Sequence, residues 1–582
     1  MAIDAGNRGS SGKRRVEVVG CSMETLARKG RNGQASQALD HDLTFAGRAR
    51  ASTPGVSDGI EQHTVMENKP GSHSSSRSIE ICERSSMSQQ PKGSWANGGE
   101  AGMEVGIAEK AGNAAGAKTS TAVECGRQTF TTRRGRGGMA RDLTQIREKA
   151  RKEPETCFTS IYHYVTDEDN LYASYRDLEP GKAPGIDGVT KEEYGKDLER
   201  NITDLAQRLA RMDYRPKPVK RVYIPKPGSD KKRPLGITCF EDKLVQKAEA
   251  RVLEQIYEVD FQDSSYGYRP GRSCHQALDA LGRTIQRKKV SYVVESDIRG
   301  FFDHVNHEWL LKFLGLRIGD KRVLRLIWRM LKGGVMEDGL TRASEEGTPQ
   351  GGSLSPLLSN VYLHYALDLW FERRFRKQCR GEAYYFRFAD DFLACFQYRD
   401  DAERFLVEMK ERLGKFHLEV EATKTKLLKF GRFAQENAER EGKKPETLTF
   451  LGFTHYCGQT RYGCFKVQRR TSKKKFRAKL KEIKAWLKET RCHQKAGALL
   501  RQAKAKLQGH LNYYAITDNG PMCASYRFQV TRLLFKWLNR RSQRRSYNWG
   551  RFNDALAWVG WPSVRIVHNL DPFRKPVGLE NC

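Results

Sequence analysis

The sequence predicts an α+β protein preceded by a disordered extension, and three observations support this prediction. The first 140 of the 582 residues hold 21 of the 52 glycines but only 3 of the 57 aromatic residues. From about residue 140, charged amphipathic segments alternate with short apolar runs, which is typical of helices mixed with strands. Beyond residue 470 the chain becomes strongly basic and helical in pattern.

The amino-terminal 140 residues lack the apolar side chains that a core needs. Ordering a chain costs roughly 1 to 2 kcal/mol per residue, and burial must offset that cost. We therefore expect residues 1–140 to form a disordered, low-complexity extension. Its basic patch at 131–138, TTRRGRGG, is either a solvated linker or an RNA contact.

Charge restricts the class of partner. The formal net charge is +33 and the pI is near 9.7, and the extension contributes only +5 of that charge. A folded region this basic needs an anionic partner, usually nucleic acid. No apolar run approaches the ~20 residues of a membrane span, so no membrane partner is expected. The 13 cysteines are scattered without a C-x-x-C pair, and no apolar secretory signal is present, which indicates a reducing, cytoplasmic setting.

The apolar periodicity predicts individual elements between 141 and 465. Apolar residues recur every three or four positions over 241–258, which predicts a helix. The segment 291–298, SYVVESDI, predicts a strand that ends on a carboxylate. Two further apolar runs, 383–388 and 392–396, predict a tight hairpin with acidic residues at its tip.

Acidic residues at the ends of these strands suggest a metal site. Asp297 and the pair Asp390–Asp391 lie about 90 residues apart, each at the end of an apolar strand. Two-metal phosphoryl transfer needs carboxylates on rigid elements to hold two ions about 4 Å apart. Because aspartate also favours turns for its own sake, these residues alone leave a purely structural role open.

Eight segments in chain order extend this interpretation. They are GKAPGIDGVT (181–190), YIPKPGSDKKRPLGI (223–237), YGYRPGRS (266–273), VESDIRGFFDHVNH (294–307), GTPQGGSLSPLLSNVYL (347–363), FRFADDFLACF (386–396), EATKTKLLKFG (421–431) and FLGFTH (450–455). Together they resemble the successive blocks of group II intron reverse transcriptases. The basic segment LQGHLNYYAI (507–516) is similar to the maturase, or thumb, domain of that family.

The resemblance implies a right-hand polymerase fold with an antiparallel sheet in its palm. Fingers and palm would occupy residues 141–465, and a helical thumb or maturase domain would occupy 466–550. Residues 551–582 would be a short basic tail without the nuclease domain that many relatives append there.

The resemblance also assigns the catalytic centre. Asp297, Asp390 and Asp391 would be the catalytic, metal-binding carboxylates, and the backbone carbonyl of Ile298 would be a further ligand. The metal would be two Mg2+ ions, with Mn2+ able to substitute. Lys424 is a candidate proton donor to the departing pyrophosphate, although a lysine among other lysines is usually solvated.

Nucleotide contacts follow from the same resemblance. Lys226 and Arg233 would grip the incoming triphosphate, with Lys231 or Lys232 sharing that role. Phe302 would exclude a ribose 2′-hydroxyl, although a core position fits Phe302 or its neighbour Phe301 equally well.

Gln350 would lie along the nascent base pair, where the two glycines that follow it permit close backbone approach.

Other clusters of metal-binding residue types favour structural roles. Asp303, His304 and His307 fall at an apparent helix start. His455, Cys457 and Cys464 are spaced too irregularly for a zinc site.

The resemblance implies an RNA-directed DNA polymerase that also binds its intron RNA to assist splicing, and that acts in mobility by target-primed reverse transcription. The partners would be group II intron RNA, a DNA target or primer, and dNTPs, with a homodimer left open. Two alternatives remain at this stage. One is a splicing cofactor without polymerase activity, and the other is a reverse transcriptase of another bacterial mobile or defence system.

Overall fold

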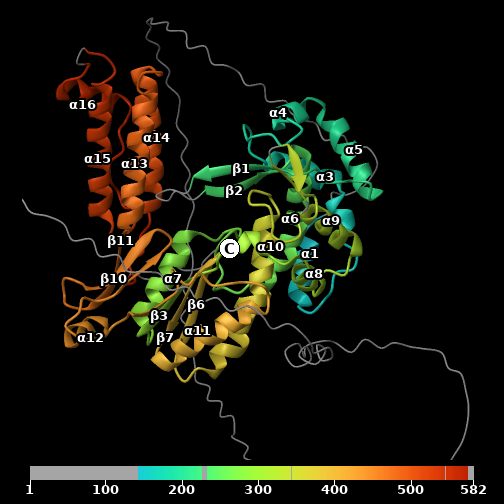
Figure 1. The fold of residues 1–582 in the computed structure, drawn as a ribbon, viewed down its shortest axis with the longest axis horizontal. Coiled ribbons are helices and arrows are strands. Elements are labelled where there is room, and N and C mark those ends of the chain that lie inside the picture. Colours follow the sequence, from blue (N-terminus) through green and yellow to red (C-terminus); the bar gives the residue numbers. More distant parts are fainter. Residues whose placement is uncertain (1–141, 226–231, 338, 343, 544–545, 574–582) are drawn as a thin grey trace, which may run out of the picture. The chain divides into compact units, whose positions relative to one another are not determined.

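The acidic strands lie in a four-stranded antiparallel sheet with the order β6-β7-β3-β8 (Figure 1). The computed structural model describes residues 142–225, 232–337, 339–342, 344–543 and 546–573. The expected extension at 1–140 therefore lies outside the described residues. The strands of this sheet are β3 (Tyr292–Asp297), β6 (Ala383–Phe388), β7 (Asp391–Phe396) and β8 (Lys426–Lys429). The predicted strand and hairpin are confirmed.

This sheet is buried on both faces. Val294, Phe392 and Ala394 belong to one hydrophobic cluster, whereas Val293 and Leu393 belong to a second. Since successive side chains on a strand point to opposite faces, the two clusters lie on opposite sides of the sheet. A strand covered on both sides reads as a continuous apolar run, which explains the pattern of residues 392–396.

Helices build the first hydrophobic cluster together with one face of the sheet. The helix α6 contacts α1, α2, α3 and α10, and α11 contacts β3 and β7. Figure 1 shows α6 between the amino-terminal helices and α10. The helices of this region are α1 (Thr144–Lys152), α2 (Tyr162–Val165), α3 (Glu168–Asp177), α4 (Lys191–Tyr194), α5 (Leu198–Ala210), α6 (Phe240–Asp260), α8 (His307–Gly315), α9 (Lys321–Leu331), α10 (Ser355–Leu363) and α11 (Arg399–Gly414). The helix predicted at 241–258 is thus confirmed as α6.

A second four-stranded sheet has the order β2-β1-β4-β5. Its strands are β1 (Val219–Pro225), β2 (Lys232–Ile237), β4 (Val335–Glu337) and β5 (Leu340–Arg342). The pair β1–β4 is parallel and the other two pairs are antiparallel. Lys226 and Lys231 lie between β1 and β2, outside the described residues.

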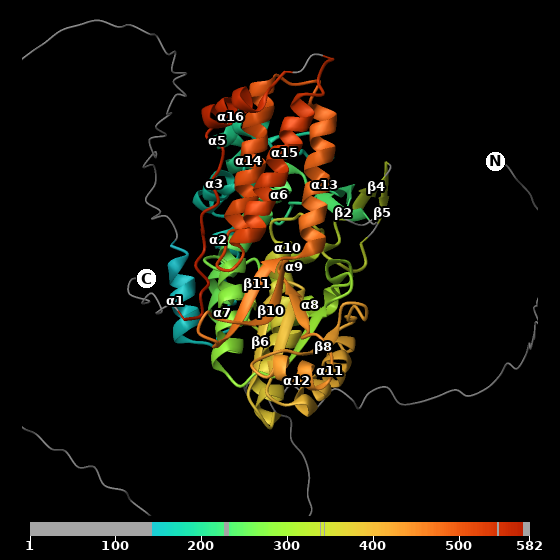
Figure 2. The same ribbon diagram turned by 90° about the vertical axis from the view of Figure 1, so that its left-hand side faces the viewer.

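A three-stranded antiparallel sheet leads into the carboxyl-terminal helices (Figure 2). It contains β9 (Thr447–Phe450), β10 (Phe453–Gln459) and β11 (Phe465–Thr471). The helices that follow are α13 (Lys473–Thr490), α14 (Ala496–Tyr514), α15 (Gly520–Leu538) and α16 (Trp549–Trp558). The helical character expected beyond residue 470 is confirmed. The expected boundary at 550/551 falls inside α16.

The second hydrophobic cluster joins these helices to the other face of the sheet β6-β7-β3-β8. Leu534, Trp537 and Leu538 are buried on one face of α15. Two further α-helices are α7 (Cys274–Arg287), which contacts β6 and β11, and α12 (Ala434–Arg440). None of the helices in the described ranges is long and apolar enough to cross a membrane.

Candidate active site

Three aspartates meet at one end of the four-stranded sheet. Asp297 ends β3 and lies directly opposite Asp391, the first residue of β7. Residues opposite each other in an antiparallel pair have Cβ atoms about 4.5 to 5.5 Å apart. Asp390 occupies the turn before β7, and its carbonyl accepts a hydrogen bond of 3.4 Å from the Ile298 amide. The structure therefore brings together the acids that the sequence singled out.

The turn itself has an unusual backbone. Only Ala389 and Asp390 separate β6 from β7, and Ala389 has a φ of 59°. That left-handed conformation is uncommon for residues other than glycine. It lets a two-residue turn present Asp390 beside the strand end that carries Asp297.

Like charges and burial act on the two hairpin carboxylates. Burial raises the pKa of Asp390, and the nearby carboxylate of Asp297 raises it further. Burial likewise raises the pKa of Asp391 well above its ordinary value, with added repulsion from Asp297, Asp390 and Glu295. Clustered carboxylates that repel one another favour a bound cation or a proton.

A lysine ammonium supplies part of the positive charge that these carboxylates favour. The Nζ atom of Lys424 forms an ion pair with Oδ2 of Asp297. Burial lowers the pKa of Lys424, but the hydrogen bond and the attraction to Asp297 outweigh burial and raise it overall. Among the residues that the structure describes, no three His, Cys, Asp or Glu side chains are arranged as a metal-binding group.

The donor set nevertheless suits a hard divalent cation. Carboxylate and carbonyl oxygens are the ligands that Mg2+ prefers, and here they sit on adjacent strand ends. With the Lys424 ammonium on Asp297, the carboxylates are already partly neutralised. The ammonium occupies Oδ2 of Asp297, so a metal ion at this carboxylate would either displace the ammonium or bind through Oδ1.

Glu295 is a fourth carboxylate that the sequence reasoning missed. It lies two residues before Asp297, so its side chain faces the same side of β3. Burial raises its pKa, while the hydrogen bond from the Thr449 amide, 3.3 Å long, lowers it. The alternation of the strand was the signal that could have identified Glu295.

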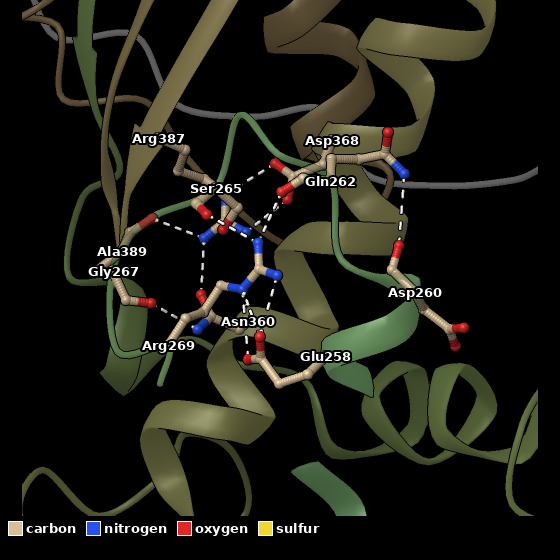
Figure 3. A network of polar contacts seen from close by, with 10 residues as sticks. All are labelled: Glu258, Asp260, Gln262, Ser265, Gly267, Arg269, Asn360, Asp368, Arg387 and Ala389. Atoms are coloured by element: carbon tan, nitrogen blue, oxygen red, sulfur yellow. Dashed lines mark hydrogen bonds and ion pairs between the residues drawn. The ribbon is translucent and has the colours of Figure 1, made fainter. Parts of the chain in front are cut away.

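A buried ion pair supports the hairpin from behind (Figure 3). The guanidinium of Arg387 donates to both carboxylate oxygens of Asp368, at 2.8 and 2.5 Å, and both side chains are fully buried. It also donates to Oδ1 of Asn360 at 3.0 Å and to the carbonyl of Ala389 at 3.1 Å. One charged group thus fixes the backbone immediately before Asp390.

The predicted nucleotide contacts fall on three neighbouring segments. Arg233 is exposed on β2, and its positive charge acts on Asp390. The carbonyl of Gln350 accepts a 2.7 Å hydrogen bond from the Gly236 amide, which joins this segment to β2. The Thr348 amide donates to the carbonyl of Phe302 at 2.7 Å. Arg233, Phe302 and Gln350 are therefore linked through one short segment.

The two phenylalanines that the sequence could not separate differ in burial. Phe301 is 1% exposed and lies in the first hydrophobic cluster, whereas Phe302 is partly buried against it. The side-chain amide of Gln350 donates to Asp303 at 3.4 Å. Phe302 is therefore the one with a face left open, next to the segment that carries Gln350.

The other clusters of metal-binding residue types make ordinary structural contacts. His307 shares a 2.7 Å hydrogen bond with the carbonyl of Gly347, and His304 pairs with Glu346 at 3.3 Å. His455 is fully buried in β10. Neither Cys457 nor Cys464 forms a disulfide, and the Cys457 thiol donates to the carbonyl of Gly431 at 3.4 Å.

Comparisons with known proteins agree with this geometry. Residues 224–455 match the family model described as reverse transcriptase (RNA-dependent DNA polymerase). The group II intron-encoded protein LtrA of Lactococcus lactis subsp. cremoris is 40% identical over 222 residues, which is 38% of this chain and 37% of that protein. The protein YkfC of Escherichia coli (strain K12) is 39% identical over 205 residues, 35% of this chain and 54% of that protein.

A plant protein also shares part of the chain. The mitochondrial nuclear intron maturase 1 of Arabidopsis thaliana is 32% identical over 95 residues, 16% of this chain and 13% of that protein. The chain spans 37% of the length of LtrA and 54% of that of YkfC. The chain therefore carries a reverse transcriptase domain at residues 224–455, and part of the chain is similar to group II intron-encoded proteins.

Proposed function

We propose that this protein is an RNA-directed DNA polymerase that also binds a group II intron RNA to assist splicing and mobility. The observation that carries the proposal is the convergence of Asp297, Asp390 and Asp391 from adjacent strand ends inside a reverse transcriptase domain. Reverse transcriptases use divalent metal ions, and we propose two Mg2+ ions here, with Mn2+ able to substitute.

Asp297, Asp390 and Asp391 would hold the metal ions, with the backbone carbonyl of Ile298 as a further ligand. The ions would lower the pKa of the primer 3′-hydroxyl and neutralise the leaving pyrophosphate. The carboxylates fix the positions of these charges, because β3 and β7 are buried on both faces. Lys424, released from Asp297, would lie close enough to donate a proton to the leaving group.

Arg233 and Lys226 would bind the triphosphate of the incoming nucleotide. Arg233 is exposed on β2, and its positive charge acts on Asp390. The guanidinium would therefore neutralise a phosphate bound between these two residues. Gln350 would contact the nascent base pair. Phe302 would exclude a 2′-hydroxyl, which gives a preference for deoxynucleotides.

A right-hand layout fits these assignments. The sheet β6-β7-β3-β8 would be the palm, and the region of α1 to α6 with the sheet β2-β1-β4-β5 would form the fingers. The helices α13 to α16 would form the thumb or maturase domain. We also propose that the protein acts in the cytoplasm with intron RNA, a DNA primer and dNTPs.

The carboxyl-terminal helices support the RNA-binding part of the proposal. Residues 470–582 carry 25 Lys and Arg against 6 Asp and Glu. On α13, Lys474, Lys481 and Lys488 are exposed at seven-residue intervals, whereas Ile483 and Leu487 are buried. A basic stripe on a helix anchored by its apolar face is suited to bind an RNA backbone.

Primer extension tests the polymerase directly. The full-length protein, an RNA template, a DNA primer, dNTPs and Mg2+ should give cDNA, and Asp390→Asn should reduce the rate by at least about 100-fold because it removes a metal-binding charge. Glu419→Asn, which changes an exposed carboxylate paired with Arg299, is the matched control and should retain activity. Undiminished cDNA from Asp390→Asn would contradict the catalytic assignment. A protein that supports splicing without making cDNA would instead be an RNA-binding cofactor.

A further inference from the structure

One exposed aromatic side chain interrupts a buried segment beside the catalytic hairpin. Ser265, Tyr266, Gly267 and Arg269 are buried, yet Tyr268 between them is 54% exposed. The segment runs alongside the end of β6, where the Tyr266 amide donates to the carbonyl of Arg387 at 2.9 Å. The tyrosine ring therefore faces outward from a tightly packed stretch of chain.

The backbone of Tyr268 is strained. Its φ of 59° lies in the left-handed region that bulky side chains rarely occupy. A glycine would adopt this conformation without penalty. Such an outlier persists only where the surrounding structure enforces it, and it justifies a hypothesis of function.

The carboxyl-terminal neighbour of Tyr268 anchors one side of this conformation (Figure 3). The guanidinium of Arg269 donates to the carbonyls of Gln262 and Ser265, at 2.7 and 2.9 Å. It also pairs with Glu258 at 3.0 Å, where both side chains are less than 10% exposed.

The amino-terminal neighbour anchors the other side. The side-chain amide of Asn360 donates to the carbonyl of Gly267 at 2.7 Å, and the same Asn360 accepts from Arg387. A Cβ atom on Gly267 would lie 2.4 Å from the amide nitrogen of Ala389. The segment is thus pressed against the turn that presents Asp390, and Tyr268 is held in place relative to that turn.

Tyr268 lies beside the acidic turn, and its hydroxyl interacts electrostatically with Asp390 and with Arg233 of β2. Its ring centroid is 6.5 Å from that of Phe388, the last residue before the turn. Burial raises the pKa of the Tyr268 hydroxyl, Asp390 raises it further, and Arg233 lowers it. The tyrosine is therefore close to both the proposed metal site and the proposed triphosphate site.

We propose that Tyr268 binds the nucleic-acid substrate by packing its ring against the terminal base pair of the primer–template duplex. This inference rests on the proposed polymerase function, because the primer 3′ end must lie beside Asp390 for the reaction to occur. The acidic turn repels phosphate groups, whereas every base pair offers an apolar π-face to an aromatic ring. The ring is 54% exposed beside Phe388, which leaves part of it open for such packing.

The experiment separates the ring from the backbone strain. A fluorescently labelled DNA primer annealed to an RNA template is titrated with full-length protein, and binding is followed by anisotropy without dNTPs. Tyr268→Gly should bind about tenfold more weakly, as expected for removal of one stacked ring. Its melting temperature should equal or exceed that of the wild type, because glycine relieves the strain. Tyr268→Phe should bind within about twofold of the wild type.

A matched control changes another exposed tyrosine. Tyr462 follows β10 and is 76% exposed. The Tyr462→Ala protein should bind the duplex as tightly as the wild type. A 2-aminopurine at the primer 3′ end should be quenched by the wild type and by Tyr268→Phe, but less by Tyr268→Gly.

Two outcomes would overturn the inference. One is a Tyr268→Gly protein that binds the duplex as tightly as the wild type. The other is a Tyr268→Gly protein with a lowered melting temperature, which would show that the ring serves the fold. Wild-type protein that binds the duplex but does not extend the primer would contradict the polymerase function instead, and the binding comparison would still decide the role of Tyr268.

Discussion

Arg387 and Asp368 form a bidentate ion pair that is closed off from solvent beside the β6–β7 hairpin. Burial lowers the pKa of Arg387, but attraction and hydrogen bonding to Asp368 outweigh it, so the pKa is raised overall. The same guanidinium reaches the carbonyl of Ala389. The geometry of the hairpin therefore depends on a charge pair that is fully buried.

We expect Arg387→Met to lower the free energy of unfolding by about 3 to 5 kcal/mol, because it leaves the carboxylate of Asp368 buried without a partner. Denaturant unfolding measures this decrease. The double variant Arg387→Met with Asp368→Leu should recover part of the lost free energy of unfolding, since neither charge of this pair is then buried. Asp400→Asn, which removes an exposed partner of Arg380, should cost less than about 1 kcal/mol. A decrease as small as this in Arg387→Met would contradict the prediction.

The raised pKa of Asp391 predicts a pH dependence of stability in metal-free protein. A carboxyl group whose pKa is raised in the folded state destabilises the folded protein as the pH rises. This loss begins near 3.8, the ordinary pKa of the group, and continues through the folded-state pKa. Asp391→Asn lacks this ionisation, so its melting temperature should exceed that of the wild type increasingly as the pH rises toward neutrality. Thermal melts in EDTA across this pH range provide the measurement. Equal melting temperatures at all pH values would show that Asp391 carries no ionisation penalty.

Lys424 is expected to compete with metal ions for Asp297. The Lys424 ammonium already neutralises part of this carboxylate cluster, so Lys424→Met should need less Mg2+ to reach half-maximal thermal stabilisation. A two- to tenfold decrease is expected. Lys410→Met on the exposed face of α11 is the matched control and should behave as the wild type. A higher Mg2+ requirement in Lys424→Met would mean that the lysine assists metal binding.

The basic stripe on α13 predicts a salt-dependent RNA affinity. Replacing Lys474, Lys481 and Lys488 by glutamine should weaken binding to structured RNA and reduce the slope of log K against log salt by up to about 3, about one for each phosphate that a lysine no longer neutralises. Filter binding at several salt concentrations measures the slope. Replacement of the exposed acids Glu482 and Glu489 by glutamine on the same helix should not reduce it. An unchanged slope in the triple variant would place the RNA-binding surface elsewhere.

The sequence predicted those parts of the site that depend on local pattern. The strand that ends on Asp297 and the hairpin around Asp390 follow from apolar runs, and their pairing follows from the antiparallel sheet of the family that the motifs resemble. Periodicity also carried the signal for Glu295, because residues two apart on a strand share a face. The alternation expected for a strand could not distinguish Phe301 from Phe302, because both lie on a short 3-10 helix, Phe301–Asp303, and their burial depends on the elements that pack against them.

Contacts between distant residues could not be predicted in the same way. Arg387 pairs with Asp368 and bonds Asn360, residues 19 and 27 positions earlier in the chain, and no local pattern marks either partner. The strain at Tyr268 likewise depends on Arg269 and Gly267 being held by Glu258 and Asn360. Such arrangements result from tertiary packing, which a single sequence does not display.

The burial of β3 and β7 between two separate hydrophobic clusters has a mechanical consequence. Neighbouring side chains such as Phe392 and Leu393 pack into clusters on opposite faces of β7. The strand end that carries the aspartates is therefore held from both sides. A cavity in either cluster, even one far from the bound nucleotide, would allow the positions of the aspartates to vary. The carboxyl-terminal helices contribute to one of these clusters. Substitutions in them would therefore change the geometry of the aspartates without contact to the reacting atoms.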